Sequence, residues 1–201
     1  LPKLKFEAEK PIEAPIVKEV VGAEAEFLVL GWRFPGAASK EAEMLNLLSS
    51  ILYNGQAGLI DLDINQEQKM LNAASYPILF ADYSMYLMQG NPKAGQSLEE
   101  VRDLLLAEVE KLKKGEFDEA LLAATVNNLK KGIQESLESN EDRADWFVQS
   151  FINGSNWADE VSAIDRLSKV TKQELVDFAN TYFKDNYAVI YKRMGQDNNA
   201  K

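Results

Sequence analysis

The order of the elements in this sequence predicts an α+β fold, a mainly antiparallel sheet with helices packed on one face. Three observations predict it. Apolar, strand-forming segments stand in the first half, at residues 25–34, 69–80 and 82–90. The second half carries helical periodicity almost throughout, and a β-rich run closes the chain at residues 187–193. Strands followed by helices favour a sheet covered on one side, and the last strand must return to the sheet that the early ones form.

Residues 1–24 are predicted to be an extended lead-in or linker. Three prolines stand there among charged residues, and a proline biases the residue before it toward extended geometry. The apolar run from Ala25 to Phe34 follows and is stopped by Pro35-Gly36, which indicates a buried or half-buried strand.

A strongly apolar helix is predicted next. Ser39 is a suitable N-cap, with Glu41 and Glu43 in the first turn, where acidic residues are favourable. Leucine, isoleucine and methionine side chains then recur at helical spacing up to Leu52, so the helix should pack on the sheet. The strands at 69–80 and 82–90 are expected to form a hairpin with a tight turn near Ala81.

The second half predicts five helices. Ser97-Leu98-Glu99-Glu100 and Thr171-Lys172-Gln173-Glu174 are capping boxes, each of which opens a helix. The predicted helices cover residues 97–114, about 117–137, 140–152, 157–167 and 171–183. We expect a single domain over residues 25–194, with residues 195–201 as the start of a C-terminal linker.

Composition excludes several classes of protein. The 201 residues include 22 basic and 32 acidic side chains, a net charge of −10. Nucleic-acid binders need clustered Lys and Arg, so we expect no nucleic-acid partner. No apolar run approaches the roughly 18–20 residues of a membrane span, so no span is expected. Residue 1 is Leu, and we interpret the sequence as a processed chain or a piece of a longer protein.

The chain contains no cysteine and no histidine. Disulfides, thiol nucleophiles, thiolate metal sites, Ser-His-Asp triads and histidine-based zinc motifs are therefore excluded. We expect no catalytic residue, no metal ligand and no cofactor in this chain. An unrelated α+β enzyme that uses Asp, Glu, Lys or Tyr stays open, although no pairing of such residues suggests one.

Two motifs are candidates for a site. Residues 61–65 resemble the start of a calcium loop, but Gln66 and Asn72 stand where that motif needs Gly and Glu. We therefore expect a solvated connecting segment there. The aromatic side chains of residues 146, 147, 151 and 157 recur at helical spacing and are expected to lie in the core, with a peptide-contacting patch as the alternative.

The chain resembles the non-catalytic α+β domain of pitrilysin/insulinase-like zinc metallopeptidases over roughly residues 25–194. The resemblance rests on five blocks in a fixed order: the strand and apolar helix of residues 27–52, the Gly turn of 51–55, the segment 69–90, the paired helices of 97–130, and the segment 168–183 with its closing strand.

The resemblance implies that this chain is one domain of a larger zinc-dependent endopeptidase. In that family zinc is held by an inverted H-x-x-E-H motif and a further Glu in a different domain, so zinc is expected in the catalytic domain of the parent protein. This chain alone is not expected to be an enzyme. Its implied role is to form part of a chamber wall, with the catalytic domain or a partner subunit as its partner, and to contact peptide substrate.

Some family members carry an Arg and a Tyr seven residues apart that contact the substrate. Lys69 and Tyr76 have this spacing here, and the resemblance makes them the candidate substrate-binding residues. Lys departs from the family's Arg because it lacks the planar, two-pronged donor.

The alternative function is a purely structural scaffold subunit of the same fold, like the non-catalytic partners of processing peptidases or the core proteins of respiratory complexes. The sequence leaves the compartment open. The bacterial cell envelope or periplasm is one candidate location for a soluble protein of this kind.

Overall fold

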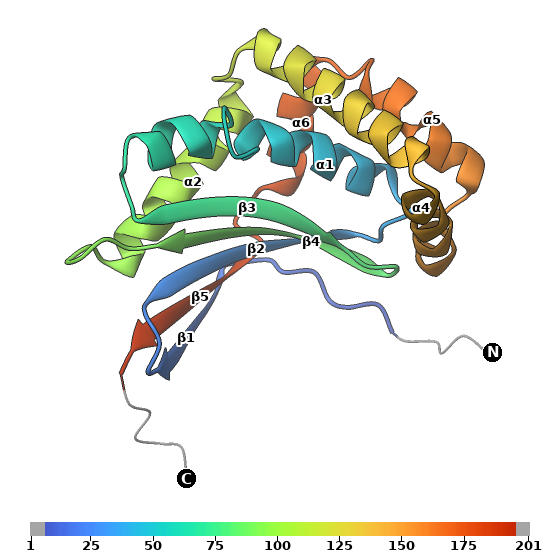
Figure 1. The fold of residues 1–201 in the computed structure, drawn as a ribbon. Coiled ribbons are helices and arrows are strands. Elements are labelled where there is room, and N and C mark those ends of the chain that lie inside the picture. Colours follow the sequence, from blue (N-terminus) through green and yellow to red (C-terminus); the bar gives the residue numbers. More distant parts are fainter. Residues whose placement is uncertain (1–6, 196–201) are drawn as a thin grey trace.

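A computed structural model describes residues 7–195 of the chain. They form one five-stranded sheet and six α-helices that cover one of its faces (Figure 1). The elements are β1 (Ile16–Gly22), β2 (Phe27–Pro35), α1 (Lys40–Leu52), the π-helix η1 (Asp61–Gln66), β3 (Asn72–Leu79), β4 (Tyr83–Asn91), α2 (Leu98–Lys114), α3 (Glu119–Glu138), α4 (Asn140–Asn153), α5 (Trp157–Leu167), α6 (Lys172–Tyr182) and β5 (Tyr187–Met194).

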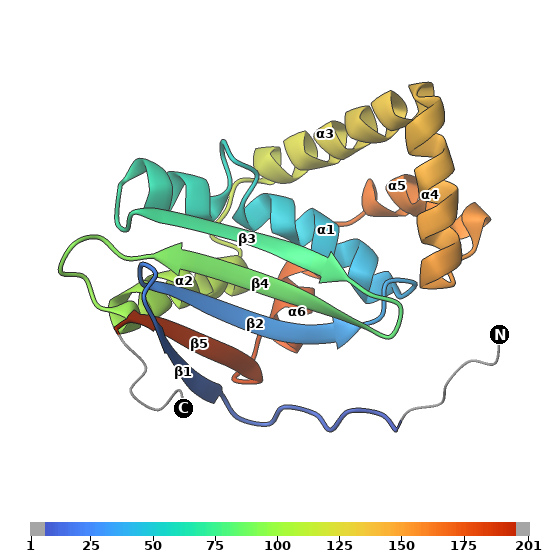
Figure 2. The ribbon, with the colours of Figure 1, turned by 60° about the horizontal axis from the view of Figure 1, so that its bottom comes forward.

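The strand order in the sheet is β1-β5-β2-β4-β3 (Figure 2). The last strand, β5, lies between β1 and β2, antiparallel to β2 and parallel to β1. The other neighbours pair in antiparallel fashion. The predicted fold class is confirmed, as is the return of the closing strand to the sheet of the early ones.

The N-terminal segment differs from its predicted role as a mere lead-in. Residues 16–22 are extended, as expected, but they form an edge strand of the sheet. The pairing partner, β5, lies about 170 residues further along the chain, so no local pattern could indicate it. Residues 1–6 and, apart from Gly195, the predicted C-terminal linker at 195–201 lie outside the described residues.

The core lies between the helices and the face of the sheet that they cover. Side chains alternate along the strands, so Leu28, Leu30, Trp32 and Phe34 of β2 are all buried on this face. Leucine and isoleucine side chains of α1 and α2 pack onto them. Phe183, just after α6, contacts the rings of Trp32, Phe34 and Tyr86 with centroids 5.0–5.6 Å apart.

Two expectations about side-chain environment were wrong. The segment around Asp61 is not a solvated connection, since Asp61 is buried and its Oδ2 accepts hydrogen bonds from the N–H groups of Asn54 (2.9 Å) and Gly58 (3.0 Å). On α4, Phe147 and Phe151 are exposed rather than part of the core, because α4 packs mainly against α3 and α5 and not on the sheet.

No helix among residues 7–195 is both long enough and apolar enough to cross a membrane.

Candidate functional site: the open face of the sheet

The face of the sheet opposite the helices carries none of the six α-helices (Figure 2). It presents the side chains that alternate with the buried ones, and those at its centre are mostly apolar. A shallow depression of about 490 Å³ lies at its centre. The depression is lined by side chains from three strands, among them Val29, Met85, Leu87, Ala188 and Ile190. An apolar surface of this kind is typical of an interface with another domain or partner.

Part of this face is crossed by the N-terminal segment. The backbone N–H of Glu9 donates to the Tyr83 hydroxyl (2.9 Å), and Arg33 donates from Nη2 to the carbonyl of Lys10 (2.5 Å). The Arg33 guanidinium also lies 5.1 Å from the centre of the Tyr83 ring. Ile12 then reaches the wall of the depression. The chain thus enters the fold across the open face before it turns into β1.

Tyr76 lies on β3, at one edge of the open face. The side chains of Ala73 and Ser75 are buried on the face that the helices cover. Tyr76 follows Ser75 and so points to the opposite face, where 41% of its surface is exposed. It pairs with Leu87 of β4. The phenol is therefore accessible at the rim of the apolar face.

Lys69 lies beyond the start of β3, in the turn after η1. Its backbone N–H donates to the carbonyl of Ile64, and its carbonyl accepts from Nε2 of Gln96 (3.0 Å). The ammonium group shares an open surface with Lys93 and Glu100. At about 3.3 Å per residue of strand, Asn72 at the start of β3 lies about 13 Å from Tyr76, and Lys69 precedes Asn72 in the turn.

The outer edge of β3 is only partly free to pair with another strand. The Asn65 side chain donates to the Ala73 carbonyl and accepts from its N–H, both at 2.9 Å. Hydrogen-bonding groups alternate along a strand, so Ser75 and Pro77 also face outward, and proline has no N–H. Of residues 73–77, only Ser75 offers an outward N–H with no partner among the described residues.

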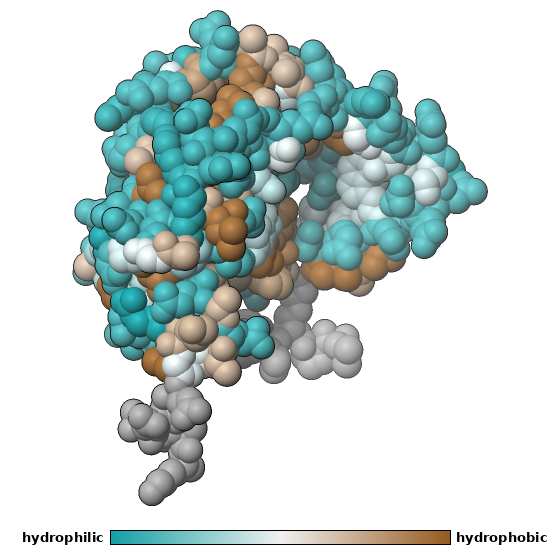
Figure 3. Space-filling model, turned by 60° about the vertical axis from the view of Figure 1, so that its left-hand side comes forward, coloured by the Kyte–Doolittle hydropathy of each residue, from teal (hydrophilic) through white to brown (hydrophobic). Residues whose placement is uncertain are grey.

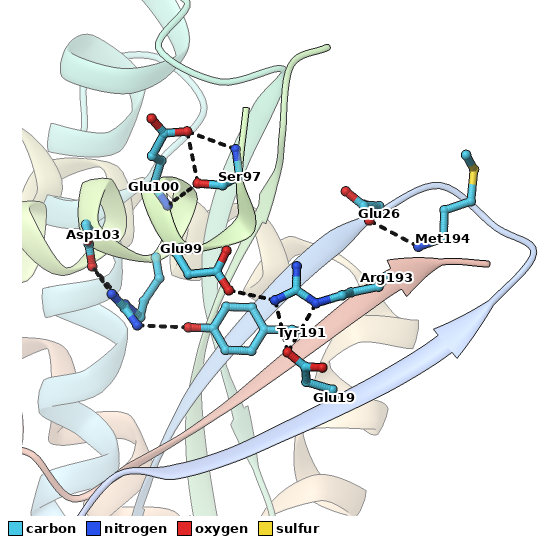
Figure 4. Close-up of polar contacts among 10 residues, drawn as sticks. Glu19, Glu26, Ser97, Glu99, Glu100, Asp103, Tyr191, Arg193 and Met194 are labelled. Carbon is cyan, nitrogen blue, oxygen red and sulfur yellow. Dashed lines mark hydrogen bonds and ion pairs between the residues drawn. The ribbon is translucent and has the colours of Figure 1, made fainter. Parts of the chain in front are cut away.

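Arg193 of β5 is the centre of a polar network at the other edge of the sheet (Figure 4). It donates to the Glu19 carboxylate of β1 (2.9 and 3.1 Å) and to Glu99 of α2 (2.6 Å). These hydrogen bonds, first those with Glu19, raise the pKa of Arg193, and the bond from Arg193 lowers the pKa of Glu99. Through these ion pairs Arg193 of β5 connects β1 to α2.

Glu108 of α2 is a buried carboxylate that lies away from the open face, next to Asp63 of η1. Burial raises the pKa of Glu108, and one of its oxygens has no hydrogen-bond partner. Lys111 bridges Glu108 (3.0 Å) and Asp63 (2.7 Å). Partial burial lowers the pKa of Lys111, but these two bonds raise it by more. The Glu108 side chain is only 4% exposed, so this carboxylate is held inside the fold rather than offered to a substrate.

A zinc site does not fit the residues of this chain. The sequence has no histidine and no cysteine, and residues 7–195 contain no group of three or more aspartate or glutamate side chains arranged to hold a metal ion. The sequence pattern did not indicate the roles of Asn65 and Arg193, because the residues that they bind come close only in the folded chain.

Comparisons with known proteins identify relatives of this chain. A family model described as "Peptidase M16 inactive domain" matches residues 1–129. The chain is 29% identical over 199 residues to the zinc protease PqqE of Helicobacter pylori, and this match covers 90% of the chain and 44% of PqqE.

Two solved structures share the fold. A protease from Helicobacter pylori superposes with a TM-score of 0.85 at 23% identity, over 96% of this chain and 49% of that one. The periplasmic protease PqqL of Escherichia coli gives 0.70 at 13% identity, over 94% of this chain and 23% of PqqL. The chain thus spans less than half the length of each of these relatives.

Proposed function

The chain belongs to the family of peptidase M16 inactive domains, and from this premise we propose that it is the non-catalytic domain of a larger zinc-dependent endopeptidase. Its work is to support the catalytic domain, to form part of the wall of the chamber that receives the substrate, and to contact the peptide. The relative PqqE is described as a zinc protease, which supports the proposed parent activity.

The observation that carries this proposal is the apolar open face of the sheet. Aliphatic side chains such as Val29, Leu87 and Ile190 line a depression there, while the six helices cover only the opposite face (Figure 1). Burying such side chains contributes about 25 cal/mol per Å² of apolar surface. A face of this kind favours a stable contact with the catalytic domain of the same polypeptide or with a partner subunit.

Zinc and the water that it activates would then be held by the catalytic domain, since this chain offers no ligand set for them. When bound, the metal supplies a hydroxide-like nucleophile at neutral pH. The residues of this chain would contribute binding and orientation of the peptide. The net charge of −10 favours peptides that carry positive charge.

Lys69 and Tyr76 are the proposed peptide contacts. Tyr76 lies on β3 at the edge of the open face, and Lys69 lies in the turn before β3, beside residues of α2. A peptide that reached both side chains would be extended over several residues. The ammonium of Lys69 can donate to a peptide carbonyl or carboxylate, and the Tyr76 phenol can donate or accept. Because Asn65 and Pro77 occupy part of the β3 edge, side-chain contacts are favoured over the addition of a full strand.

The test is peptide hydrolysis by the complete protein that contains this chain. We expect Lys69→Ala and Tyr76→Phe each to raise KM several-fold, with zinc content and kcat little changed, because uniform binding is lost. Lys130→Ala, at an exposed lysine of α3, and Tyr53→Phe are matched controls that should leave KM unchanged. Equal KM values for all four variants would refute the proposed contacts without touching the domain assignment.

The rival function, a structural scaffold subunit, is an outcome of the same experiment. A complete protein that binds no zinc and cleaves no peptide, yet requires this chain for assembly, would replace the peptidase proposal with the scaffold.

For location, we propose the periplasm, which the description of PqqL as a periplasmic protease supports. Detection of the protein in the periplasmic fraction of its native cell, rather than the cytosolic fraction, is the test.

A further inference from the structure

Helix α4 exposes a stripe of large apolar side chains, each of which keeps more than half of its surface accessible. Phe147, Val148, Phe151 and Ile152 are 53%, 52%, 87% and 57% exposed. The spacing i, i+1, i+4, i+5 places all four on one side of the helix. We refer to these four residues as the α4 stripe. Hydrophilic side chains dominate the molecular surface, and apolar patches interrupt them (Figure 3).

The helix that carries the stripe is held firmly in place at one end of the helical layer (Figures 1 and 2). The rings of Trp146 and Phe147 pack against Trp157 of α5, with centroids 5.1 and 4.1 Å apart. The Ser139 side chain caps the start of α4, and Gly154, with φ of 70°, ends it. The stripe is therefore displayed on an ordered helix rather than on a loop.

The surroundings of the stripe are strongly acidic. Residues 135–165 include eight acidic side chains and one basic side chain, a net charge of −7 out of −10 for the whole chain. On α4 itself, Glu141 and Asp145 precede Val148 and Ile152 at the spacing i, i+4, i+7 and i+11. The helix therefore brings both carboxylates to the same side as the stripe.

We propose that the α4 stripe and its acidic border bind a basic, amphipathic helix of a partner protein. The ridges of an α-helix pack into the grooves between side chains four residues apart on another helix, which suits the spacing of the stripe. The partner's apolar face covers the stripe, and lysine or arginine side chains on its flanks meet the acidic border. This surface is separate from the open sheet face assigned above to the peptidase function.

Charge distinguishes this partner from two other occupants. If a second copy of the chain bound here, residues 135–165 of both copies, each with a net charge of −7, would face one another. This repulsion opposes association. An anionic membrane surface is repelled by the same border, since membrane-surface helices carry Lys and Arg on their polar face.

The experiment measures binding of a fluorescein-labelled leucine–lysine peptide of about five helical turns, by anisotropy with the full chain. A scrambled isomer without an apolar face and a leucine–glutamate version are the probe controls. We expect the amphipathic basic peptide to bind more tightly than either control. Raising salt from about 0.05 M to about 0.5 M should weaken it, because the charges are exposed.

Variants locate the binding surface. Phe151→Ser with Ile152→Ser should weaken binding about tenfold, from the apolar area lost, and Glu141→Gln with Asp145→Asn should reduce the salt dependence. Leu71→Ser, at a side chain 74% exposed elsewhere, and Glu13→Gln with Glu116→Gln are the matched controls and should bind as wild type. Because all these side chains are exposed, the variants should fold.

Three results would overturn the proposal. Stripe variants that bind the peptide as tightly as the matched controls would show that the peptide binds elsewhere. Sedimentation with phosphatidylserine vesicles that depends on Phe151 would identify a membrane as the occupant. Dimerisation of the full chain that Phe151→Ser abolishes would identify a second copy.

Discussion

The side chain of Asn65 makes two hydrogen bonds with the backbone of Ala73, one as donor and one as acceptor, both 2.9 Å long. Asn65 thus takes the place of a neighbouring strand at the start of the β3 edge. Unpaired edges promote pairing between chains, and proteins commonly block them. Pro77 blocks the same edge further on, by its missing N–H.

Replacing Asn65 with Ala should lower the free energy of unfolding by about 1–2 kcal/mol, since both backbone groups of Ala73 lose their partner. Urea denaturation measures this change. Asn65→Asp should also destabilise at neutral pH, because a carboxylate cannot donate to the Ala73 carbonyl. Glu67→Ala, at an exposed neighbour, is the control. Equal midpoints for Asn65→Ala and Glu67→Ala would show that the pair contributes nothing.

Gly36→Ala should destabilise the protein by about 2–3 kcal/mol, the scale of overpacking. A Cβ at Gly36 would lie 2.0 Å from the carbonyl oxygen of Ala81, at the tip of the β3–β4 hairpin. The adjacent N–H of Ala37 donates to the Phe80 carbonyl (2.8 Å), so the tip cannot withdraw freely.

Gly132→Ala, in the middle of α3, is the matched comparison. A Cβ there meets no atom within 4 Å, so the higher helix propensity of Ala should stabilise the protein by about 0.5–1 kcal/mol. Thermal unfolding of the two variants should shift the midpoint in opposite directions. A common direction would contradict the packing argument at Gly36.

The elements that sequence predicted well are those determined locally. The capping boxes of Ser97 with Glu100 and of Thr171 with Glu174 are both formed as expected, because each needs only four consecutive residues. The buried face of β2 likewise follows from alternation.

The features that sequence missed depend on distant partners. Strand β1 exists because β5 supplies its hydrogen bonds, and Asp61 is buried because Asn54 and Gly58 turn their N–H groups toward it. Helical spacing on α4 indicated an apolar face correctly but could not tell whether the fold covers it. The peptide contacts of Lys69 and Tyr76 stay a prediction.

Glu108→Gln should change how stability depends on pH. Burial raises the folded-state pKa of Glu108 above its unfolded value. The charged form therefore costs stability in the folded state, a cost that is absent at low pH and develops as pH rises through the folded-state pKa. Gln cannot ionise. The free energy of unfolding of the variant minus that of wild type should become more positive as pH rises, then level off.

Urea denaturation of both proteins between about pH 3 and pH 7 gives this difference curve. Glu110→Gln, two residues along α2, is the control, because its carboxylate is more than half exposed. A flat difference curve for Glu108→Gln, or one that falls with pH, would contradict the assignment of Glu108 as a buried, poorly solvated carboxylate.

The Arg193 network should contribute little to overall stability but much to the position of β1. The side chains of Glu19 and Glu99 are 55% and 46% exposed, and exposed ion pairs are worth up to about 1 kcal/mol. A double-mutant cycle of Arg193→Ala with Glu19→Gln should give a coupling below about 1 kcal/mol. The lowered pKa of Glu99 means that its own contribution is present at neutral pH and lost as pH falls through that pKa.

Hydrogen exchange separates the two effects of Arg193→Ala. Strand β1 lies at the edge of the sheet, and all its residues except Gly22 are exposed. In the variant, the amides of β1 should therefore exchange faster, and the increase should be larger than the loss of global stability explains. The amides of β4, inside the sheet, are the internal control. Equal acceleration of β1 and β4 would mean that Arg193 stabilises the whole sheet, because only global unfolding exposes both strands to the same extent.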